Sequence, residues 1–292
     1  MELNKNLISL ISATKTAQTN PDSDVEIHTL LCRKDIYPYL AAIKSFLAFY
    51  DNVRVIVHDD GTLTVGGKKL LREHIRGVKV INRQEADRRV KKRLSGKKQC
   101  LMYREKCPNF FQEIDYFIFS STDKIISFDS DVLFFKYPRE IVDWITGIQS
   151  VIKYNFELRA GVFPINILNP SFPFPLLAGF NSGLVCAYRE IADFGLLEKC
   201  LKYIAQSKEH KDYEPWLALL SQDLMGSYVA SSGMKSQALS PELYKTIVHY
   251  LRTQRRNDFR KKCIFRHYNW ATLRWHDDFG YEQDIRNIIN VL

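Results

Sequence analysis

An apolar run over residues 125–135 is broken by two carboxylates, Asp129 and Asp131, one residue apart. The rest of this run is typical of a buried strand, where a bare carboxylate is costly unless it is paired or bound to metal. Residues i and i+2 of an extended chain point to the same side. Asp129 and Asp131 can therefore hold one divalent cation and leave its open positions to phosphate oxygens. The competing interpretation is a solvated surface turn.

Strand and helix patterns alternate along the first part of the chain. Strands are predicted over residues 25–32, 53–57 and 78–81, and helices over residues 37–49, 68–76, 83–94 and 110–120. This alternation predicts a largely parallel sheet with helices on its faces. Farther along, the sequence predicts a strand over residues 180–188 and helices over residues 191–204 and 216–230. We expect one α/β domain, because no linker rich in Gly or Ser divides the chain.

Composition narrows the class of protein. The chain has 292 residues, of which 46% are hydrophobic, enough for a sizeable core. No apolar run approaches the roughly 18 to 20 residues that a membrane span needs, and residues 1–20 lack the order of a signal peptide. We therefore expect a soluble, cytoplasmic protein. The six cysteines are expected to be reduced thiols.

Positive charge is concentrated in one stretch. The net charge is +9, and residues 68–106 contain fifteen Lys or Arg against four Asp or Glu. Three interpretations stay open: a solvated face, a platform for anionic lipid or nucleic acid, or a surface that attracts a polyanionic acceptor. The basic face suits peripheral contact with a membrane. Nucleic acid is the weakest candidate partner, because no nucleic-acid-binding motif accompanies the charge.

Polar groups occur at three further places. Asn181, Ser182 and Gly183 are predicted to form a polar turn that precedes an apolar strand, and Gly183 allows a close approach of the backbone to a ligand. Gln222 and its neighbours interrupt the apolar stretch of a helix, where a polar group needs a partner or a task. His267 is a candidate ligand for Mn²⁺ beside carboxylates. The alternatives are an ordinary loop, the wet face of a helix and a structural histidine.

The order of these motifs resembles the GT-A glycosyltransferases, and in particular their family 8-like branch of nucleotide-sugar transferases. The resemblance covers the chain from about residue 26 to its end and implies a GT-A type domain with a Rossmann-like, mostly parallel central sheet flanked by helices. It implies an N-terminal extension over residues 1–24, then a nucleotide-binding half over residues 25–140 and an acceptor-binding half over residues 141–292.

The resemblance also implies roles for single residues. Asp131 would be the main metal ligand, with Asp129 contacting both metal and ribose and His267 as the third ligand, and the metal would be Mn²⁺ or Mg²⁺. The nucleotide-binding set that follows from it is Cys32, Arg33, Asp59, Asp60, Asp129, Ser130 and Arg274. The sugar and acceptor pocket would be formed by Asn181, Ser182, Gly183 and Gln222, and the catalytic residues would be Gln222, Asp223 and Asn181.

Three departures from the family pattern concern this site, and one of them is that Trp270 and Arg274 stand where the family has Gly and Lys. Ser221 stands before Gln222, where relatives often have a carboxylate, and Asp223 is a candidate substitute. The basic residue usual near Gln112 is missing, and Lys124 or Arg104 could supply the charge.

The expected function is metal-dependent transfer of a sugar from a nucleoside-diphosphate sugar, with UDP as the first candidate carrier. The acceptor stays open between a glycan, a lipid-linked sugar, a small molecule and a protein side chain. Relatives of this kind retain anomeric configuration; an inverting enzyme would need a base, for which Asp223 and Glu214 are candidates. The alternatives are a nucleotidyltransferase, which residues 29–35 disfavour because they contain no glycine, and a non-catalytic scaffold.

Overall fold

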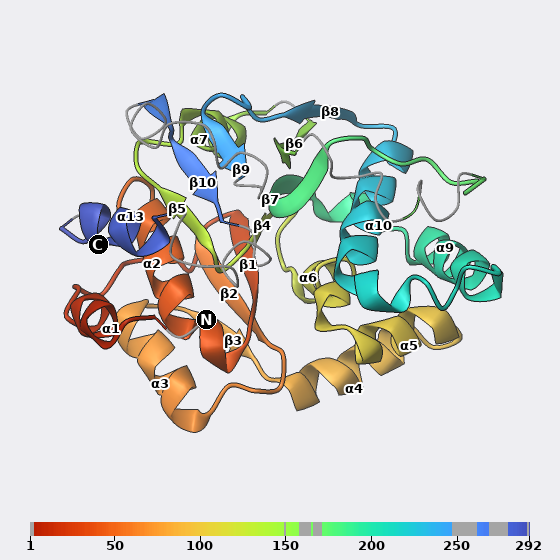
Figure 1. Cartoon of the computed structure of the whole chain (residues 1–292), viewed down its shortest axis with the longest axis horizontal. Coiled ribbons are helices and arrows are strands. Elements are labelled where there is room, and N and C mark those ends of the chain that lie inside the picture. Colours follow the sequence, from red (N-terminus) through yellow and green to blue (C-terminus); the bar gives the residue numbers. More distant parts are fainter. Residues whose placement is uncertain are drawn as a thin grey trace.

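The computed structural model describes residues 3–148, 150–157, 165, 171–246, 262–268, 280–290 and 292. Its centre is a seven-stranded sheet in the order β3-β2-β1-β4-β7-β6-β8 (Figure 1). The pairs β1–β2, β2–β3, β1–β4 and β6–β8 are parallel, and β7 is antiparallel to both neighbours. The sheet is therefore mostly parallel, as the alternation in the sequence predicts.

The strands of this sheet are β1 (Val25–Leu31), β2 (Arg54–Asp59), β3 (Lys79–Ile81), β4 (Lys124–Phe128), β6 (Val151–Phe156), β7 (Phe180–Tyr188) and β8 (Lys235–Ala238). The helices of the described residues are α1 (Lys5–Ser12), α2 (Ile36–Leu47), α3 (Val65–His74), α4 (Arg83–Arg93), α5 (Lys98–Lys106), α6 (Asp115–Phe119), α7 (Arg139–Thr146), α9 (Phe194–Gln206), α10 (Leu217–Ser231) and α13 (Tyr281–Ile288).

Helices cover both faces of the sheet because successive strand residues point to opposite sides. Ile27 on β1 and Ile126 on β4 belong to the core that α1, α2, α3, α7 and α13 cover. Ile56 on β2 and Ile125 on β4 belong to the core that α4, α5, α6, α9 and α10 cover (Figure 1). The predicted α/β fold class, with a central sheet between helices, is confirmed.

A second, three-stranded sheet places a late segment of the chain, β10, beside β5. It has the order β5-β10-β9, with β5 (Val132–Phe134), β9 (Tyr244–Thr246) and β10 (Phe265–His267). Strand β10 is antiparallel to β5 and parallel to β9. Because β5 directly follows the Asp-x-Asp segment, this pairing brings β10 beside residues more than a hundred positions earlier in the chain.

Two features of the sequence fold differently from the prediction. The run over residues 125–135 is not one strand: β4 belongs to the large sheet, β5 to the small one, and residues 129–131 form the connection. The prediction of one continuous helix over residues 110–120 is also wrong. Pro108 opens a short 3-10 helix (Pro108–Phe111), and α6 begins only at Asp115. The break frees the side chains of Gln112 and Glu113 from a helix surface.

Helix α1 lies within the residues that the sequence assigns to an N-terminal extension. Asn4 caps it by accepting a hydrogen bond from the Asn6 N–H at 2.9 Å. Leu7 and Ile11 are fully buried in the core that also contains α2. This helix therefore packs as part of the folded core.

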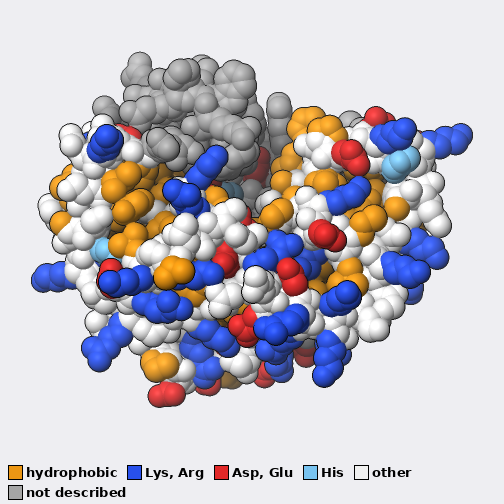
Figure 2. Space-filling model, turned by 90° about the horizontal axis from the view of Figure 1, so that it is seen from below, with side chains coloured by type: hydrophobic (Ala, Val, Ile, Leu, Met, Phe, Trp, Pro, Cys, Tyr) orange, Lys and Arg blue, Asp and Glu red, His pale blue; other side chains and the backbone are white. Residues whose placement is uncertain are grey.

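The basic stretch over residues 68–106 forms α3, β3, α4 and α5. Figure 2 shows Lys and Arg side chains over this face, with Asp and Glu side chains between them. Part of the charge is paired: Lys68 contacts Asp59 at 2.6 Å, and Arg83 contacts Asp87 at 2.8 Å. Among the described helices, none is long and apolar enough to cross a membrane. All six cysteines are free thiols.

Candidate functional site

Three predicted metal ligands converge where β4 ends. Asp129, Asp131 and His267 each offer a ligand atom, and these atoms lie within 4.8 Å of one another. His267 Nε2 lies 3.5 Å from Asp129 Oδ2 and 3.2 Å from Asp131 Oδ1. Carboxylate oxygens suit Mg²⁺ and Mn²⁺, and a neutral imidazole beside them is a further ligand for a transition metal. The residues present therefore fit the divalent cation that the sequence predicts.

Backbone pairing fixes how these ligands meet. His267 is the last residue of β10 and pairs in antiparallel register with Val132, the residue after Asp131. The Tyr268 N–H donates to the Asp131 carbonyl oxygen at 3.0 Å. The turn of residues 129–131 and the end of β10 are thus joined by main-chain contacts, which fix the distance between the two carboxylates and the imidazole.

The charges of the cluster depend on one another. Burial raises the pKa of the Asp129 carboxyl to about 6, although the neighbouring His267 acts in the opposite direction. Burial by itself lowers the pKa of His267, but the carboxylates of Asp131, Asp129 and Glu157 outweigh it and raise this pKa to about 9. Without a cation, the cluster therefore favours a proton on His267. A divalent cation would replace that proton as the positive charge between the carboxylates.

Asn181 orients the histidine. Its Oδ1 lies 3.0 Å from His267 Nδ1 and also accepts the Gly183 N–H at 3.0 Å, while its Nδ2 donates to Glu157 Oε2 at 2.9 Å. An acceptor at Nδ1 keeps the proton on that nitrogen and leaves the lone pair of Nε2 for a metal. Asn181 is 1% exposed, so its contacts are with these protein groups.

Gly183 is required by the same histidine. A Cβ atom at this position would lie 2.3 Å from His267 Cε1 and 2.5 Å from Nδ1, where no side chain fits. The close approach that the sequence predicts for Gly183 is thus made by the imidazole ring. The Asp129 N–H also donates to the Gly183 carbonyl oxygen at 3.0 Å. Residues 181–183 therefore lie inside β7 and not in the polar turn that the sequence predicts, and they form one side of the cluster of Asp129, Asp131 and His267.

Gln112 contacts the cluster from another element. Its Nε2 donates to Asp129 Oδ1 at 3.0 Å, which leaves Asp129 Oδ2 facing His267. Neither candidate for the missing basic residue reaches this place. Arg104 is held by Asp115 through two hydrogen bonds of 2.6 and 2.7 Å. The Lys124 ammonium donates to three carbonyl oxygens at the end of α7, at the opposite end of β4.

Comparisons with known proteins identify the fold. No family model matches the chain, and no curated protein matches it in sequence. Among solved structures, mouse xyloside xylosyltransferase 1 superposes with a TM-score of 0.51 at 14% identity, covering 85% of this chain and 98% of that one. The galactosyltransferase LgtC, in complex with donor and acceptor sugar analogues, gives a TM-score of 0.50 at 13% identity, covering 91% and 96%.

The chain has a GT-A glycosyltransferase fold. A second structure of LgtC, an active-site mutant, agrees, with a TM-score of 0.51 at 11% identity over 90% of this chain and 95% of that one. The mostly parallel sheet and its flanking helices account for this likeness. At these identities the superposition establishes the architecture, and the chemistry has to be argued from this chain's own residues.

Helix α10 brings Gln222 to the strand that carries Asn181. Gln222 Oε1 accepts the Ser182 N–H at 3.1 Å, and the Ser182 hydroxyl lies 3.5 Å from the same oxygen. These contacts fix the plane of the Gln222 amide beside residues 181–183 of β7. The structure thus joins the residues that the sequence assigns to a sugar pocket, and it sets them next to His267.

The side chain before Gln222, Ser221, contacts a carboxyl group from another segment. The Ser221 hydroxyl donates to Glu113 Oε1 at 2.8 Å, and Glu113 is fully buried. Burial raises the pKa of Glu113 to about 8. The sequence prediction missed this residue. Its signal is the one that marks Asp129, a carboxylate among apolar neighbours, here Phe110, Phe111 and Ile114.

The two carboxylates proposed as bases occupy different environments. Asp223 is fully buried, and its Oδ2 accepts the Ile165 N–H at 3.2 Å. Burial raises the pKa of Asp223 to about 8. Glu214 is exposed and lies 3.4 Å from the Lys106 ammonium. Among the described residues, Asp223 is the one of the two whose surroundings exclude water.

The acidic turn after β2 is held by its own side chains. Asp59 Oδ1 accepts the N–H groups of Gly61 at 2.8 Å and Leu63 at 3.1 Å, and Asp60 Oδ1 accepts the Thr62 N–H at 2.8 Å. Gly61 has φ of 104°, which favours glycine. Asp59 therefore shapes the turn, while Asp60 is less buried at its tip.

The end of β1 lies against this acidic turn. The Arg33 N–H donates to Thr62 Oγ1 at 2.8 Å, and the Cys32 thiol donates to Asp35 Oδ2 at 3.1 Å. The predicted nucleotide-binding residues that follow β1 and end β2 thus meet at the carboxyl ends of these strands, where open α/β sheets bind ligands. Ser130 is half-buried between Asp129 and Asp131. Arg274 lies outside the described residues.

Proposed function

We propose that the chain is a metal-dependent glycosyltransferase that moves a sugar from a nucleoside-diphosphate sugar, first of all a UDP-sugar, to an acceptor. The observation that carries this proposal is the convergence of Asp129, Asp131 and His267 at the carboxyl end of β4 in a GT-A fold. The turn at Asp59 and Asp60 is the proposed nucleoside site, and Arg274 is proposed to contact the diphosphate.

Metal binding is assigned to the chain's acidic cluster and to the histidine beside it. A divalent cation, Mn²⁺ or Mg²⁺, supplies Lewis acidity to a departing diphosphate when it is bound. Asp129 and Asp131 offer carboxylate oxygens, and His267 offers Nε2. Asn181 holds the other ring nitrogen of His267, and Gln112 holds the second oxygen of Asp129. The chain thus presents its ligands in a preset arrangement.

Gln222 is the proposed stabiliser of the reacting sugar. Loss of the diphosphate leaves positive, oxocarbenium-like charge on the sugar, and a fixed amide dipole can stabilise it. Ser182 fixes the Gln222 amide through its N–H. Asp223 is the alternative catalytic group, as a base for inversion. Because burial raises the pKa of Asp223 to about 8, this carboxyl keeps its proton at neutral pH, which favours retention of configuration.

For the acceptor, we propose only a chemical class. The structure of LgtC was solved with an acceptor sugar analogue, which supports a sugar hydroxyl on a glycan or on a lipid-linked sugar. A small molecule and a protein side chain are the other candidates. We propose that Asn181, Ser182, Gly183 and Gln222 line this pocket from β7 and α10. The cytoplasm is the proposed compartment, with peripheral membrane contact through the basic face of α3, α4 and α5.

Donor hydrolysis tests this proposal directly. The purified protein is incubated with Mn²⁺ and a panel of UDP-, GDP- and TDP-sugars, and free nucleotide is measured. Release of one nucleotide in the presence of Mn²⁺, and its loss in Asp131→Asn, is the expected result. Asp143→Asn removes an exposed carboxylate on α7 and serves as the matched control. Absence of both nucleotide release and nucleotide binding would refute an enzymatic role.

Two rival functions predict other outcomes. A nucleotidyltransferase would form a nucleotide sugar from a nucleoside triphosphate and a sugar phosphate, with release of pyrophosphate. A non-catalytic scaffold would bind donor in the presence of Mn²⁺ without turning it over. Ser221 is the residue that favours the scaffold, and the convergence of Asp129, Asp131 and His267 argues against that interpretation.

A further inference from the structure

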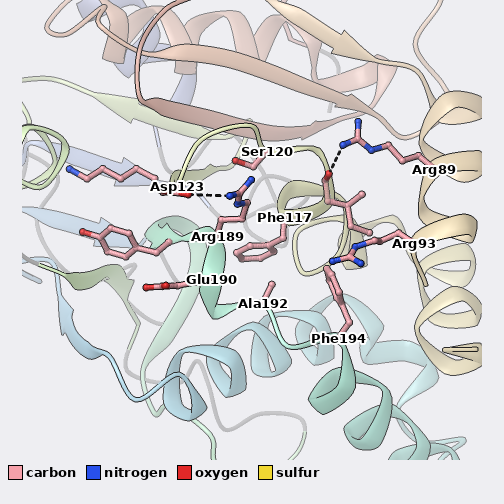
Figure 3. A pocket seen from close by; sticks show the side chains of 12 residues that line it. Arg89, Arg93, Phe117, Ser120, Asp123, Arg189, Glu190, Ala192 and Phe194 are labelled. Carbon is pink, nitrogen blue, oxygen red and sulfur yellow. Dashed lines mark hydrogen bonds and ion pairs between the residues drawn. The ribbon is translucent and has the colours of Figure 1, made fainter. Parts of the chain in front are cut away.

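A cavity lies at the opposite end of β4 from the cluster of Asp129, Asp131 and His267. Its volume is about 780 Å³. Lys124, at its wall, begins β4, whereas Asp129 directly follows the last residue of that strand. At about 3.3 Å per residue, the two sites are separated by roughly 16 Å along the strand. The lining residues come from α4, α6, the start of β4, the end of β7 and the start of α9 (Figure 3).

Three arginines give this cavity its charge. Arg89 and Arg93 come from one face of α4, one helical turn apart, and Arg189 follows β7. In Figure 3 the guanidinium groups of Arg93 and Arg189 approach the cavity from opposite sides, with Phe117 between them. Such planar groups bind phosphate oxygens through paired N–H donors.

The arginine donors are only partly used within the protein. Arg89 Nη2 donates to the Ile118 carbonyl oxygen at 3.0 Å, and Arg189 Nη2 donates to Asp123 Oδ1 at 3.2 Å. Each guanidinium has five N–H donors, so both keep donors for a ligand. Arg93 is exposed and has no ion pair with any other described residue.

The other charged groups of the lining matter less. The Lys124 ammonium is saturated by carbonyl oxygens at the end of α7, the nearest at 2.7 Å. Asp123 and Glu190 are acidic, and the Asp123 side chain is 86% exposed, so water screens its charge. The lining holds four cationic side chains against two acidic ones, and the cavity therefore favours an anion.

Apolar side chains make up most of the rest of the wall. Phe117 and Ile118 are buried, while Phe194 and Ala192 are half-buried at the start of α9. A free inorganic ion would use the guanidinium groups alone. An aromatic floor beside them offers contact to an organic group, and the volume is in the range of small-molecule sites, about 300 to 1,000 Å³.

We propose that this cavity binds an organic phosphate, with its phosphate between Arg93, Arg189 and Arg89 and its organic part against Phe117 and Phe194. Such a phosphate occurs in a soluble metabolite and in the headgroup of a lipid. The site is separate from the metal cluster, so this proposal does not depend on the transferase activity.

Calorimetric titration with phenyl phosphate and with inorganic phosphate tests the pocket. We expect phenyl phosphate to bind more tightly than inorganic phosphate. Arg93→Ala and Arg189→Ala each remove charge-assisted hydrogen bonds and should weaken phenyl phosphate binding about tenfold or more. Arg93→Lys should restore part of the affinity, because a lysine keeps the charge without the fork. Both arginines are exposed, so thermal unfolding should show intact folds.

Lys92→Ala is the matched control, because Lys92 is an exposed cation beside Arg93 on α4 that does not line the cavity. It should change the affinity less than twofold. Vesicles of phosphatidylglycerol, compared with phosphatidylcholine, identify a lipid source: binding that Arg93→Ala weakens and Lys92→Ala does not supports the pocket. Equal losses in both variants, or no binding of phenyl phosphate and of either vesicle, would overturn the proposal.

Discussion

Two groups of carboxylate and histidine side chains, one at the connection after β4 and one on β1 and β2, shift the pKa of their histidines in opposite directions. In the first group, the side chains of Asp129, Asp131 and His267 converge on one point. In the second group, Glu26 Oε2 lies 3.1 Å from His28 Nε2, and His28 Nδ1 lies 2.9 Å from His58 Nε2. The side chains of the second group lie in a line, Glu26 to His28 to His58, so they do not converge on one point as the first group does.

The histidines respond differently to these arrangements. In the line, burial lowers the pKa of His28 despite the contact with Glu26, and it lowers the pKa of His58 well below the usual range. In the cluster, several carboxylates outweigh burial and raise the pKa of His267 to about 9. Residue types alone therefore do not make a metal site: the number of carboxylates that converge on the imidazole decides its charge.

The largest expected difference concerns the histidines themselves. His267→Gln should abolish measurable Mn²⁺ binding, because it removes a ligand and the group that the carboxylates surround. His28→Gln removes an imidazole from the line and should leave Mn²⁺ affinity within about threefold of the native value, which is under 1 kcal/mol. Titration calorimetry with Mn²⁺ measures both. Equal losses in the two variants would show that the cluster and the line are not distinct.

A smaller loss is expected when the imidazole is displaced. Gly183→Ala adds a Cβ that would lie 2.3 Å from His267 Cε1. The ring has to move away from the carboxylates, and Mn²⁺ affinity should fall about 100-fold, the upper end of the effects seen for residues that orient ligands. Gly66→Ala is the control, because its nearest neighbouring atom lies 3.9 Å away. Native affinity in Gly183→Ala would contradict the observed packing.

Loss of the amide that orients His267 should be milder still. Asn181→Ala removes the acceptor at Nδ1 but leaves the ligands in place, and Mn²⁺ affinity should fall about 10- to 100-fold. Asn155→Ala removes another buried amide, one that donates to Thr246 Oγ1 at 2.6 Å. It should lower the thermal midpoint without a comparable loss of affinity. If both variants lose affinity alike, Asn181 acts only through stability.

The pH dependence of metal binding tests the electrostatic contrast. Because the pKa of His267 is raised to about 9, a cation has to displace a proton below that pH. Mn²⁺ affinity should therefore rise about tenfold per pH unit between roughly pH 7 and 9. The raised pKa also stabilises the metal-free fold below pH 6.5, and this contribution is lost as pH rises through about 9. A flat affinity profile would contradict a protonated His267.

No effect on the metal is expected from Glu26→Gln. The pKa of Glu26 is lowered to about 2, because hydrogen bonds from His28 and Ser121 outweigh burial. Its carboxylate therefore stabilises the fold above pH 4.5, and the contribution is lost as pH falls toward about 2. The variant should lose roughly 3 kcal/mol of unfolding free energy at pH 7, measured by urea denaturation, with Glu85→Gln as an exposed control. A change in Mn²⁺ affinity would show that Glu26 is coupled to the site of Asp129, Asp131 and His267, against this expectation.

The sequence predicts the three residues of the cluster, but it predicts few of the residues that contact them. Asp129 and Asp131 stand out because they interrupt an apolar run, and His267 follows from the order of the motifs. Glu113 carries the same local signal, but no pattern connects it to Ser221, which lies 108 positions later. Asn181 was expected to line a sugar pocket, and its contact with His267 spans 86 positions. Such contacts depend on which strands pair.

The sequence by itself determined the layers of this protein. The periodicity of apolar residues is a local property, so the strands β1, β2 and β7 and the helices between them can be predicted from neighbouring residues. Only the tertiary structure decided that the apolar run around Asp129 and Asp131 divides between two sheets, and that β10 brings His267 to the division. The reason is physical: a carboxylate's environment is set by chain segments that pack against it, and no local pattern records which segments those are.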